Sequence, residues 1–218
     1  MRVHLKTQPC HQIIPFNHQH LLVGTIHKWL GWNEEHGRIS LYSFSRLTGG
    51  KSKPEGLTFE TGSSFFFSSH DVTIIKRLIE GVTADSAMFH GLRIQEIMMQ
   101  EDPDLINREI FQVGSPIFIK RREGENIAHI LYKDPRASAC LVESLKSKME
   151  VAGMEDDSLE INFVSDYQKA STKKINYNGI ENRASWCPVV IKGKPETKLF
   201  AWNVGLGNST GIGFGAII

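Results

Sequence analysis

The chain has 218 residues, of which 40% are hydrophobic, 22% charged and 9% aromatic. This composition excludes an intrinsically disordered chain and fits one large domain or two domains of about 100 residues. The formal net charge is +1, from 25 Lys and Arg against 24 Asp and Glu. Near-neutrality argues against a uniformly basic nucleic-acid-binding protein.

The cysteines and the hydropathy pattern indicate a compartment. Cys10, Cys140 and Cys187 are far apart and odd in number, so they form neither a disulfide framework nor a Cys-x-x-Cys motif. Residues 1–6 alternate and carry charge, unlike the apolar core of a signal peptide. No apolar run approaches the roughly 18 residues of a membrane span. We therefore expect a soluble, cytoplasmic protein with reduced thiols and no membrane contact.

The first half has the pattern of a βαββαβ unit. Asn17 and Asp71 are typical N-cap residues in front of two amphipathic stretches. Three consecutive phenylalanines at 65–67 are expected in strand core, although alternation sends one ring to the opposite face. The patterns predict strands at 2–7, 41–45, 63–69 and 92–97, helices at 17–30 and from 71 onward, and turns at 49–50 and 54–56. This order is that of a ferredoxin-like unit.

The second half repeats this order. The patterns predict a hairpin from strands 117–120 and 127–132, helices at 135–151 and 198–203, and strands at 160–164, 189–192 and 214–218. The acidic segment 101–104 has the composition of a linker. We therefore predict an α+β fold of two tandem ferredoxin-like (RRM-like) βαββαβ units with a C-terminal glycine-rich loop. The domains are expected at residues 1–108 and 109–218.

The most unusual segment is 205–215, which holds five glycines in eleven residues. Such density implies positive φ angles or close approach of the backbone to another group. Loops of this kind bind phosphate through N–H groups. This one lacks the lysine of a P-loop, and it runs into a strand, whereas a Rossmann fingerprint opens a helix. A phosphate-binding loop and a structural turn between two sheets both stay open.

The spacing of the glycines is similar to that of a known family. Gly–apolar–Gly occurs twice, at 205–207 and at 213–215, and resembles the C-terminal signature of the RAMP superfamily of CRISPR-associated proteins. Residues 15–21 and 41–45 resemble the first helix and second strand of its repeat-processing endoribonucleases, and 115–116 fit the start of its second unit. The resemblance covers both ends and the middle of the chain, whereas 135–195 contribute little. It implies cleavage of precursor CRISPR RNA within the repeats.

The histidines supply candidate catalytic groups. Six of the nine fall within residues 4–36, and histidine exchanges protons near neutral pH. RNA cleavage needs a base, an acid and a cation for the charged phosphorane. The resemblance implies an active-site histidine at His36 and places His27 where the family often has tyrosine. The family's lysine is replaced by Ser40, so Arg38 is our candidate cation.

Each assignment has an alternative. His27 adjoins the apolar stripe of its helix, where a packed, hydrogen-bonded histidine is common. His36, without the resemblance, would be interpreted as a solvent-facing loop residue. Lys51 or Lys53 could supply the positive charge instead of Arg38.

We expect no metal site and no cofactor. His18, His20 and His36 lack paired carboxylates at helical spacing, apart from Glu34 and Glu35, which we expect to face water. His18 and His20 are expected to cap and support the first helix.

RNA binding would also need cations outside the catalytic group. Residues 169–198 hold seven Lys and Arg against two Glu, and 120–122 form a second basic cluster. Such clusters are most often solvated surface, and they also suit contacts to an RNA backbone. The predicted RNA-binding residues are Gly205, Gly207, Gly213, Gly215, Lys51, Lys53, Lys120, Arg121, Arg122, Lys173 and Lys174.

Three functions are considered. The leading hypothesis is a metal-independent endoribonuclease that cleaves CRISPR repeat RNA and leaves a 2′,3′-cyclic phosphate and a 5′-hydroxyl. The second is a non-catalytic RAMP subunit that binds guide RNA. The third is a ferredoxin-like enzyme or regulator of a small phosphorylated ligand, without salt-dependent RNA affinity. Beyond repeat RNA, other effector subunits and a second copy of the chain are partners that the sequence leaves open.

Overall fold

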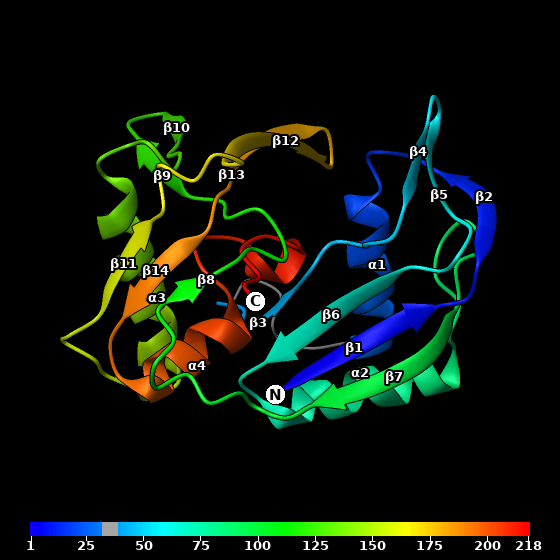
Figure 1. The fold of residues 1–218 in the computed structure, drawn as a ribbon, viewed down its shortest axis with the longest axis horizontal. Coiled ribbons are helices and arrows are strands. Elements are labelled where there is room, and N and C mark those ends of the chain that lie inside the picture. Colours follow the sequence, from blue (N-terminus) through cyan, green and yellow to red (C-terminus); the bar gives the residue numbers. More distant parts are fainter. Residues whose placement is uncertain (32–38) are drawn as a thin grey trace.

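The computed structural model describes residues 1–31 and 39–218. One antiparallel sheet and two helices form most of the first half. In sheet order the strands are β3 (Tyr42–Phe44), β6 (Ser64–Ser69), β1 (Arg2–Thr7) and β7 (Ile94–Gln100). The helices α1 (Gln19–Leu30) and α2 (Val72–Ala84) pack on one face of this sheet (Figure 1). This is the ferredoxin-like strand order, with the first and third strands in the centre.

Helix α2 shows how local sequence sets an element. Asp71 accepts a hydrogen bond from the N–H of Thr73 at 2.7 Å, as expected for an N-cap. Ile74, Ile75 and Leu78 then bury one face against the sheet and α1. The prediction of this helix from its cap and apolar stripe is confirmed.

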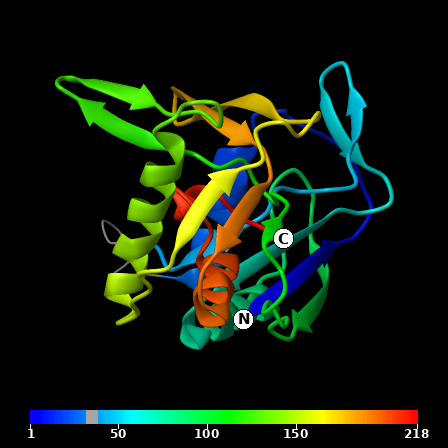
Figure 2. The same cartoon turned by 60° about the vertical axis from the view of Figure 1, so that its left-hand side comes forward.

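The second half repeats the arrangement around a smaller sheet. Its strands, in sheet order, are β11 (Glu160–Phe163), β14 (Val189–Lys192) and β8 (Ile110–Phe111), and its helices are α3 (Ala137–Val151) and α4 (Pro195–Val204). The last residues pair beside β8, because Gln112 and Ile218 exchange backbone hydrogen bonds of 2.8 and 2.9 Å. Figure 2 shows α3 lying along β11. The predicted tandem ferredoxin-like fold is confirmed.

Additional strands extend these units. They are β2 (Cys10–Ile14), β4 (Lys51–Lys53) and β5 (Gly56–Phe59) in one sheet, and the hairpins β9 (Lys120–Glu123) with β10 (Asn126–His129) and β12 (Ser171–Tyr177) with β13 (Ile180–Trp186). The residue pattern predicted no strand at 10–14 or at 171–186. Polar residues dominate β12, so apolar alternation is missing there. Its turn carried the clearer signal, since Asn178 and Gly179 both have positive φ, at 50° and 81°.

Some predicted boundaries were wrong by a few residues. The first hairpin of the second half pairs 120–123 with 126–129, whereas the apolar residues had suggested 117–120 and 127–132. Helix α4 begins at Pro195, three residues before its predicted start, because proline is favoured at the first helical position. The predicted strand 214–218 is a short pairing, with one β-bridge between Val113 and Ile217.

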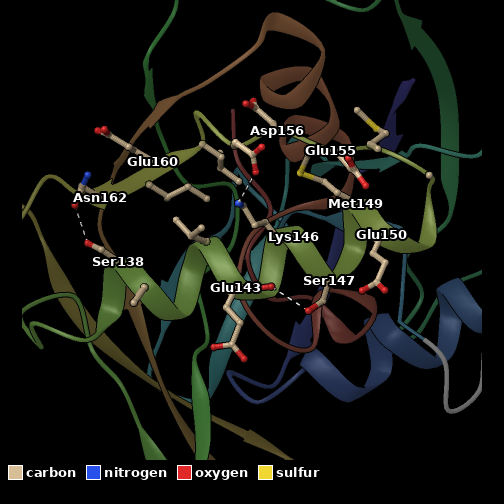
Figure 3. A pocket seen from close by; sticks show the side chains of 17 residues that line it. Ser138, Glu143, Lys146, Ser147, Met149, Glu150, Glu155, Asp156, Glu160 and Asn162 are labelled. Carbon is tan, nitrogen blue, oxygen red and sulfur yellow. Dashed lines mark hydrogen bonds and ion pairs between the residues drawn. The ribbon is translucent and has the colours of Figure 1, made fainter.

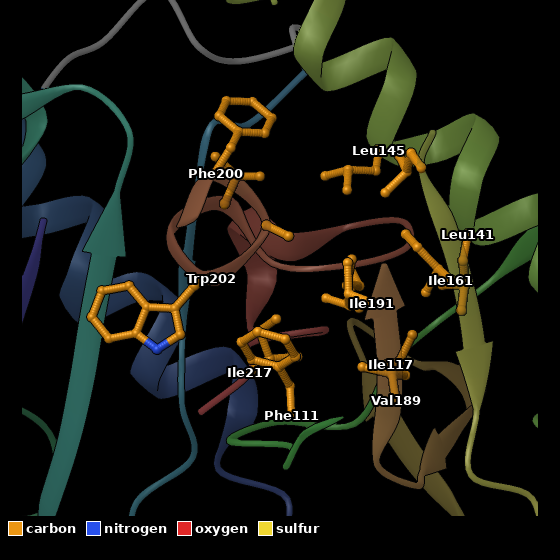
Figure 4. Packing of buried hydrophobic residues seen from close by; sticks show 14 of the residues in the cluster. Phe111, Ile117, Leu141, Leu145, Ile161, Val189, Ile191, Phe200, Trp202 and Ile217 are labelled. Atoms are coloured by element: carbon orange, nitrogen blue, oxygen red, sulfur yellow. The ribbon is translucent and has the colours of Figure 1, made fainter. Parts of the chain in front are cut away.

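Two apolar cores lie under the two sheets. Phe65 and Phe67 are buried in the first, and Phe111, Phe200 and Ile191 belong to the second (Figure 4). Figure 4 also shows Trp202 at the edge of the second core, on the side of the first sheet.

Phe66 points to the other face of its strand, as alternation requires. This ring is nevertheless buried, with 5% of its surface exposed, because the second half of the chain covers it.

Arg2 joins the two halves. Its guanidinium lies between two aromatic rings, 3.7 Å from the centroid of Phe66 and 3.4 Å from that of Trp202. One of its nitrogens donates to the carbonyl oxygens of Trp202 and Ile217, at 2.8 and 2.7 Å. The side chain is 2% exposed, and burial lowers its pKa well below the usual value. Both rings and both carbonyls are needed, since burying a cation without partners is costly.

Arg2→Ala is expected to lower the free energy of unfolding by about 3 kcal/mol, because it removes the stacked cation and leaves two buried carbonyls without donors. Chemical denaturation followed by circular dichroism measures this. The control is Arg93→Ala, which removes an exposed arginine and should cost about 0.5 kcal/mol or less. Equal losses in the two variants would show that the Arg2 contacts do not hold the halves together.

Candidate functional site

The N-terminus of α1 contacts the glycine-rich segment. The side-chain amide of Gln19 donates to the carbonyl oxygens of Ile212 and Gly213, at 2.8 and 3.1 Å. Gln19 is 4% exposed, so this contact is shielded from solvent. The two sequence motifs that had been noted independently, about 190 residues apart, are therefore adjacent in space.

The glycine-rich segment needs glycine for packing reasons. Gly205, Gly207, Gly213 and Gly215 are all buried and have φ between 70° and 86°. A Cβ at Gly215 would lie 1.9 Å from the carbonyl oxygen of Leu206. The segment thus fits the structural-turn alternative, and direct RNA contact by the glycines stays a prediction.

A cavity of about 440 Å³ opens beside this segment. It is bounded by the glycine-rich segment, by β9, by α3 and by the residues that precede β3. The lining residues are Ile39, Ser40, Lys120, Arg121, Glu143, Ser144, Ser147, Lys148, Gly207, Asn208, Ser209 and Thr210.

Two basic residues of this cavity come from β9. The backbone N–H of Lys120 donates to the Oδ1 atom of Asn208 at 2.9 Å, and the N–H of Asn208 donates to the carbonyl of Phe118 at 2.7 Å. The Arg121 guanidinium donates to the Glu143 carboxylate at 2.7 Å. The strand is thus fastened to the glycine-rich segment, and Lys120 has no ion pair within the described residues.

Lys148 is the third cation of the cavity. Its ammonium donates to the carbonyls of Val204 and Gly205 and to the hydroxyl of Thr210, at 3.2, 3.0 and 3.2 Å. These acceptors are all neutral, and burial lowers the pKa of Lys148 to about 7. Lys148 therefore ties α3 to the end of α4 and to the 3₁₀ turn Thr210–Ile212.

Lys148 was not among the predicted site residues, although its position in the sequence carries a signal. Lys148 lies three residues after Leu145 and seven after Leu141, on the stripe that α3 buries. A lysine within such a stripe must find acceptors in the interior.

The structure describes one of the three predicted catalytic residues. His27 is half-buried in the last turn of α1, and its carbonyl accepts the N–H of Gly31 at 3.0 Å. His27 does not line the cavity. His36 and Arg38 lie outside the described residues.

The predicted cations Lys51 and Lys53 lie elsewhere. Both are on β4 and share the carboxylate of Glu60, at 3.0 and 3.7 Å. These lysines lower the pKa of Glu60. The hairpin of β4 and β5 stands apart from the glycine-rich segment (Figure 1). Lys51 and Lys53 therefore do not share a site with Lys120.

The remaining predicted cations lie on the two exposed hairpins of the second half. Arg122 is on β9, and Lys173 and Lys174 are on β12. The hairpins meet where the N–H of Arg183 donates to His129 at 3.3 Å. Lys174 pairs with Glu181 at 3.2 Å. The two hairpins thus carry these cations together with the carboxylates of Glu123 and Glu181.

Two further features of the described residues bear on function. None of their His, Cys, Asp and Glu side chains form a group of three or more that could hold a metal ion. Among the helices described, none has the length and apolar character needed to cross a bilayer.

The chain matches the family model described as "CRISPR associated protein Cas6, C-terminal" over residues 99–217, which is more than half of its length. No curated protein matches it by sequence.

Three solved structures share its fold over 100% of the chain. One is titled "CRISPR associated protein Cas6" (20% identity, 98% of that chain, TM-score 0.84). Another is a Cas6-related protein of Pyrococcus furiosus (23%, 97%, 0.86). The third is titled "An RAMP protein binding different RNA substrates" (23%, 98%, 0.83). At these identities the likeness establishes the fold.

Lys148→Met is expected to remove a pH dependence of stability. Between pH 7 and the usual lysine pKa of 10.5, the unfolded chain binds more protons at this residue than the folded chain does. The free energy of unfolding therefore rises with pH in this window. Below pH 7, burying the protonated Lys148 lowers the free energy of unfolding by its full amount. Urea denaturation from pH 6 to 10 should show a steeper rise for the wild type than for Lys148→Met. Lys146→Met, on the exposed side of α3, is the control and should follow the wild type. Parallel curves for all three proteins would contradict the prediction.

Gly215→Ala and Gly124→Ala form a matched pair. Both glycines have positive φ, at 70° and 63°, but a Cβ at Gly124 would meet nothing within 4 Å. The Gly124 variant should lose about 1 kcal/mol from backbone strain, and the Gly215 variant at least about 3 kcal/mol, because the backbone at Leu206 must also move. Thermal denaturation of both variants measures the difference. A Gly215 variant as stable as the Gly124 variant would disprove the close packing.

Proposed function

Since the chain belongs to the Cas6 family of CRISPR-associated proteins, we propose that it is a metal-independent endoribonuclease that cleaves precursor CRISPR RNA within its repeats. The observation that carries the proposal is the contact of Gln19 with Ile212 and Gly213. It brings the helix of His27 against the segment that borders a cationic cavity.

The proposed chemistry is an attack of the RNA on itself. The 2′-hydroxyl oxygen bonds to the adjacent phosphorus, and the bond from phosphorus to the 5′-oxygen breaks. One of His27 and His36 takes the proton of the 2′-hydroxyl, and the other protonates the leaving oxygen. Arg38 stabilises the negative charge of the phosphorane. The products are a 2′,3′-cyclic phosphate and a 5′-hydroxyl.

The cavity beside the glycine-rich segment supports RNA binding by charge. It holds the cations Lys120 and Arg121 against the carboxylate of Glu143, and Lys148, whose pKa is about 7, adds part of a positive charge near neutral pH. Ser40, which stands two residues after Arg38 in the sequence, lines the same cavity. In the proposal an RNA phosphate next to the cleaved bond enters here, with Lys120 as a cation that faces it. In the proposal Arg122, Lys173 and Lys174 on the two hairpins add further contacts to the RNA.

In the proposal the two domains, residues 1–108 and 109–218, have different roles. The first sheet ends with β7 at Gln100, and the second begins with β8 at Ile110. The N-terminal part would carry the catalytic residues, and the C-terminal part most of the RNA-binding cations.

A second candidate is a RAMP subunit that binds guide RNA without cleaving it. Likeness in fold to the protein titled as binding different RNA substrates favours it. Affinity for RNA without turnover distinguishes this function from the first.

The test is cleavage of a labelled synthetic repeat RNA from the CRISPR array encoded nearest to this chain's gene, in the presence of EDTA. We expect cutting at one position, with a 2′,3′-cyclic phosphate on the upstream product. The same RNA with a 2′-deoxy nucleotide before that position should bind and stay intact. His27→Ala and His36→Ala should each slow cleavage by at least about 100-fold while affinity changes little.

His11→Ala is the control, because His11 is an exposed histidine on β2. Cleavage of the deoxy RNA at the normal rate, or cleavage that requires a divalent metal, would overturn the mechanism. Binding without cleavage, unchanged by His36→Ala, would establish the second candidate.

A further inference from the structure

A groove of about 990 Å³ runs between α3 and the segment that leads into β11 (Figure 3). It is separate from the cavity beside the glycine-rich segment, although Glu143 and Ser147 border both. The residues that line it are Ser138, Ala139, Val142, Glu143, Lys146, Ser147, Met149, Glu150, Gly153, Met154, Glu155, Asp156, Asp157, Leu159, Glu160, Ile161 and Asn162.

The floor of the groove is apolar. Met149, Leu159 and Ile161 are buried members of the second core, and Val142 and Met154 pack against that core with part of their surface exposed. A ligand lying in the groove would therefore cover Val142 and Met154, and this burial would favour binding.

The rim of the groove is acidic. Among the described residues that line it, six are carboxylates and one, Lys146, is a cation. The Glu143, Asp157 and Glu160 carboxylates are paired, with Arg121, Lys146 and Lys192 at 2.7, 3.7 and 3.3 Å.

The other three carboxylates differ in what they can offer a ligand. Asp156 is buried and turned inward. Burial alone would raise its pKa, but hydrogen bonds from Ser158 and Lys194 outweigh burial and lower the pKa to about 2. Glu150 and Glu155 are exposed and make no ion pair within the part of the chain that the structure describes.

The negative charge of the rim determines which kind of ligand the groove can bind. An RNA backbone would be repelled by the acidic rim, so the groove is not part of the proposed RNA path. A cationic ligand with an apolar side fits both the floor and the rim. The groove also has the length of a helix, since its α3 wall runs from Ser138 to Glu150, which is about 18 Å at 1.5 Å per residue.

We propose that this groove docks a basic amphipathic helix of a protein partner. Apolar side chains of the helix, spaced by three and four residues, lie on Val142 and Met154. Lysine or arginine side chains on its flanks pair with Glu150 and Glu155. In this proposal docking is a separate role from RNA cleavage, because His27, the proposed catalytic residue that the structure describes, does not line the groove.

The probe is a fluorescent 18-residue helical peptide with leucine on one face and lysine on the other, and its binding to the full chain is followed by anisotropy. An otherwise identical peptide with glutamate in place of lysine should not bind. The double variant Glu150→Lys with Glu155→Lys should weaken binding of the lysine peptide by at least about tenfold. Glu80→Lys with Glu101→Lys makes the same change of net charge at exposed positions in the first half of the chain and should alter the affinity less than about twofold.

The apolar floor is tested separately by Met154→Gln. It should weaken binding of the lysine peptide several-fold while the chain stays folded, which thermal denaturation checks. Binding of both peptides alike, equal losses in the two double variants, or displacement of the lysine peptide by repeat RNA would overturn the proposal. If the wild type self-associates in sedimentation and the Glu150 and Glu155 double variant does not, the occupant is a second copy of the chain and the proposed partner is wrong.

Discussion

The burial of one guanidinium holds this architecture together. Arg2 is on the central strand of the first sheet, yet its carbonyl acceptors belong to Trp202 and Ile217 in the second half. A cation removed from water needs such partners in fixed positions. The hydrogen bonds from the Arg2 guanidinium to these carbonyls align α4 and the C-terminal residues against β1. The glycine-rich segment, which connects those two elements, is then placed against the N-terminus of α1.

The glycine-rich segment shows how a motif can combine architecture with chemistry. Its glycines are buried, and neighbouring backbone occupies the space that side chains would need. Between them, Asn208 binds the backbone of Lys120 and Thr210 accepts from Lys148. The glycines thus make the close crossing feasible, whereas the intervening polar residues fix the positions of the cations. A pattern first noted for phosphate binding therefore serves that role, in our proposal, indirectly.

The sequence predicted the helices and strands whose own residues show an N-cap, an apolar stripe or apolar alternation. Asp71 and the apolar stripe after it were sufficient for α2, and apolar alternation was sufficient for β1. The hairpin of β12 and β13 was missed because its residues are mostly polar and its pairing is set by an Asn-Gly turn. At the candidate site, composition alone could not separate Lys120 from Lys51, since only the fold shows that one borders the cavity and the other shares Glu60. Lys148 required knowing which face of α3 is buried.

The contact of Arg2 also constrains the order of folding. Its acceptors lie 200 and 215 residues along the chain, so during synthesis β1 leaves the ribosome long before they exist. Until the second half has been synthesised, Arg2 on the central strand of the first sheet has no acceptors and Phe66 is uncovered. Contacts of such high sequence separation slow folding and leave apolar surface open to association. We therefore expect a residue that takes no part in the proposed chemistry to influence expression yield and chaperone dependence.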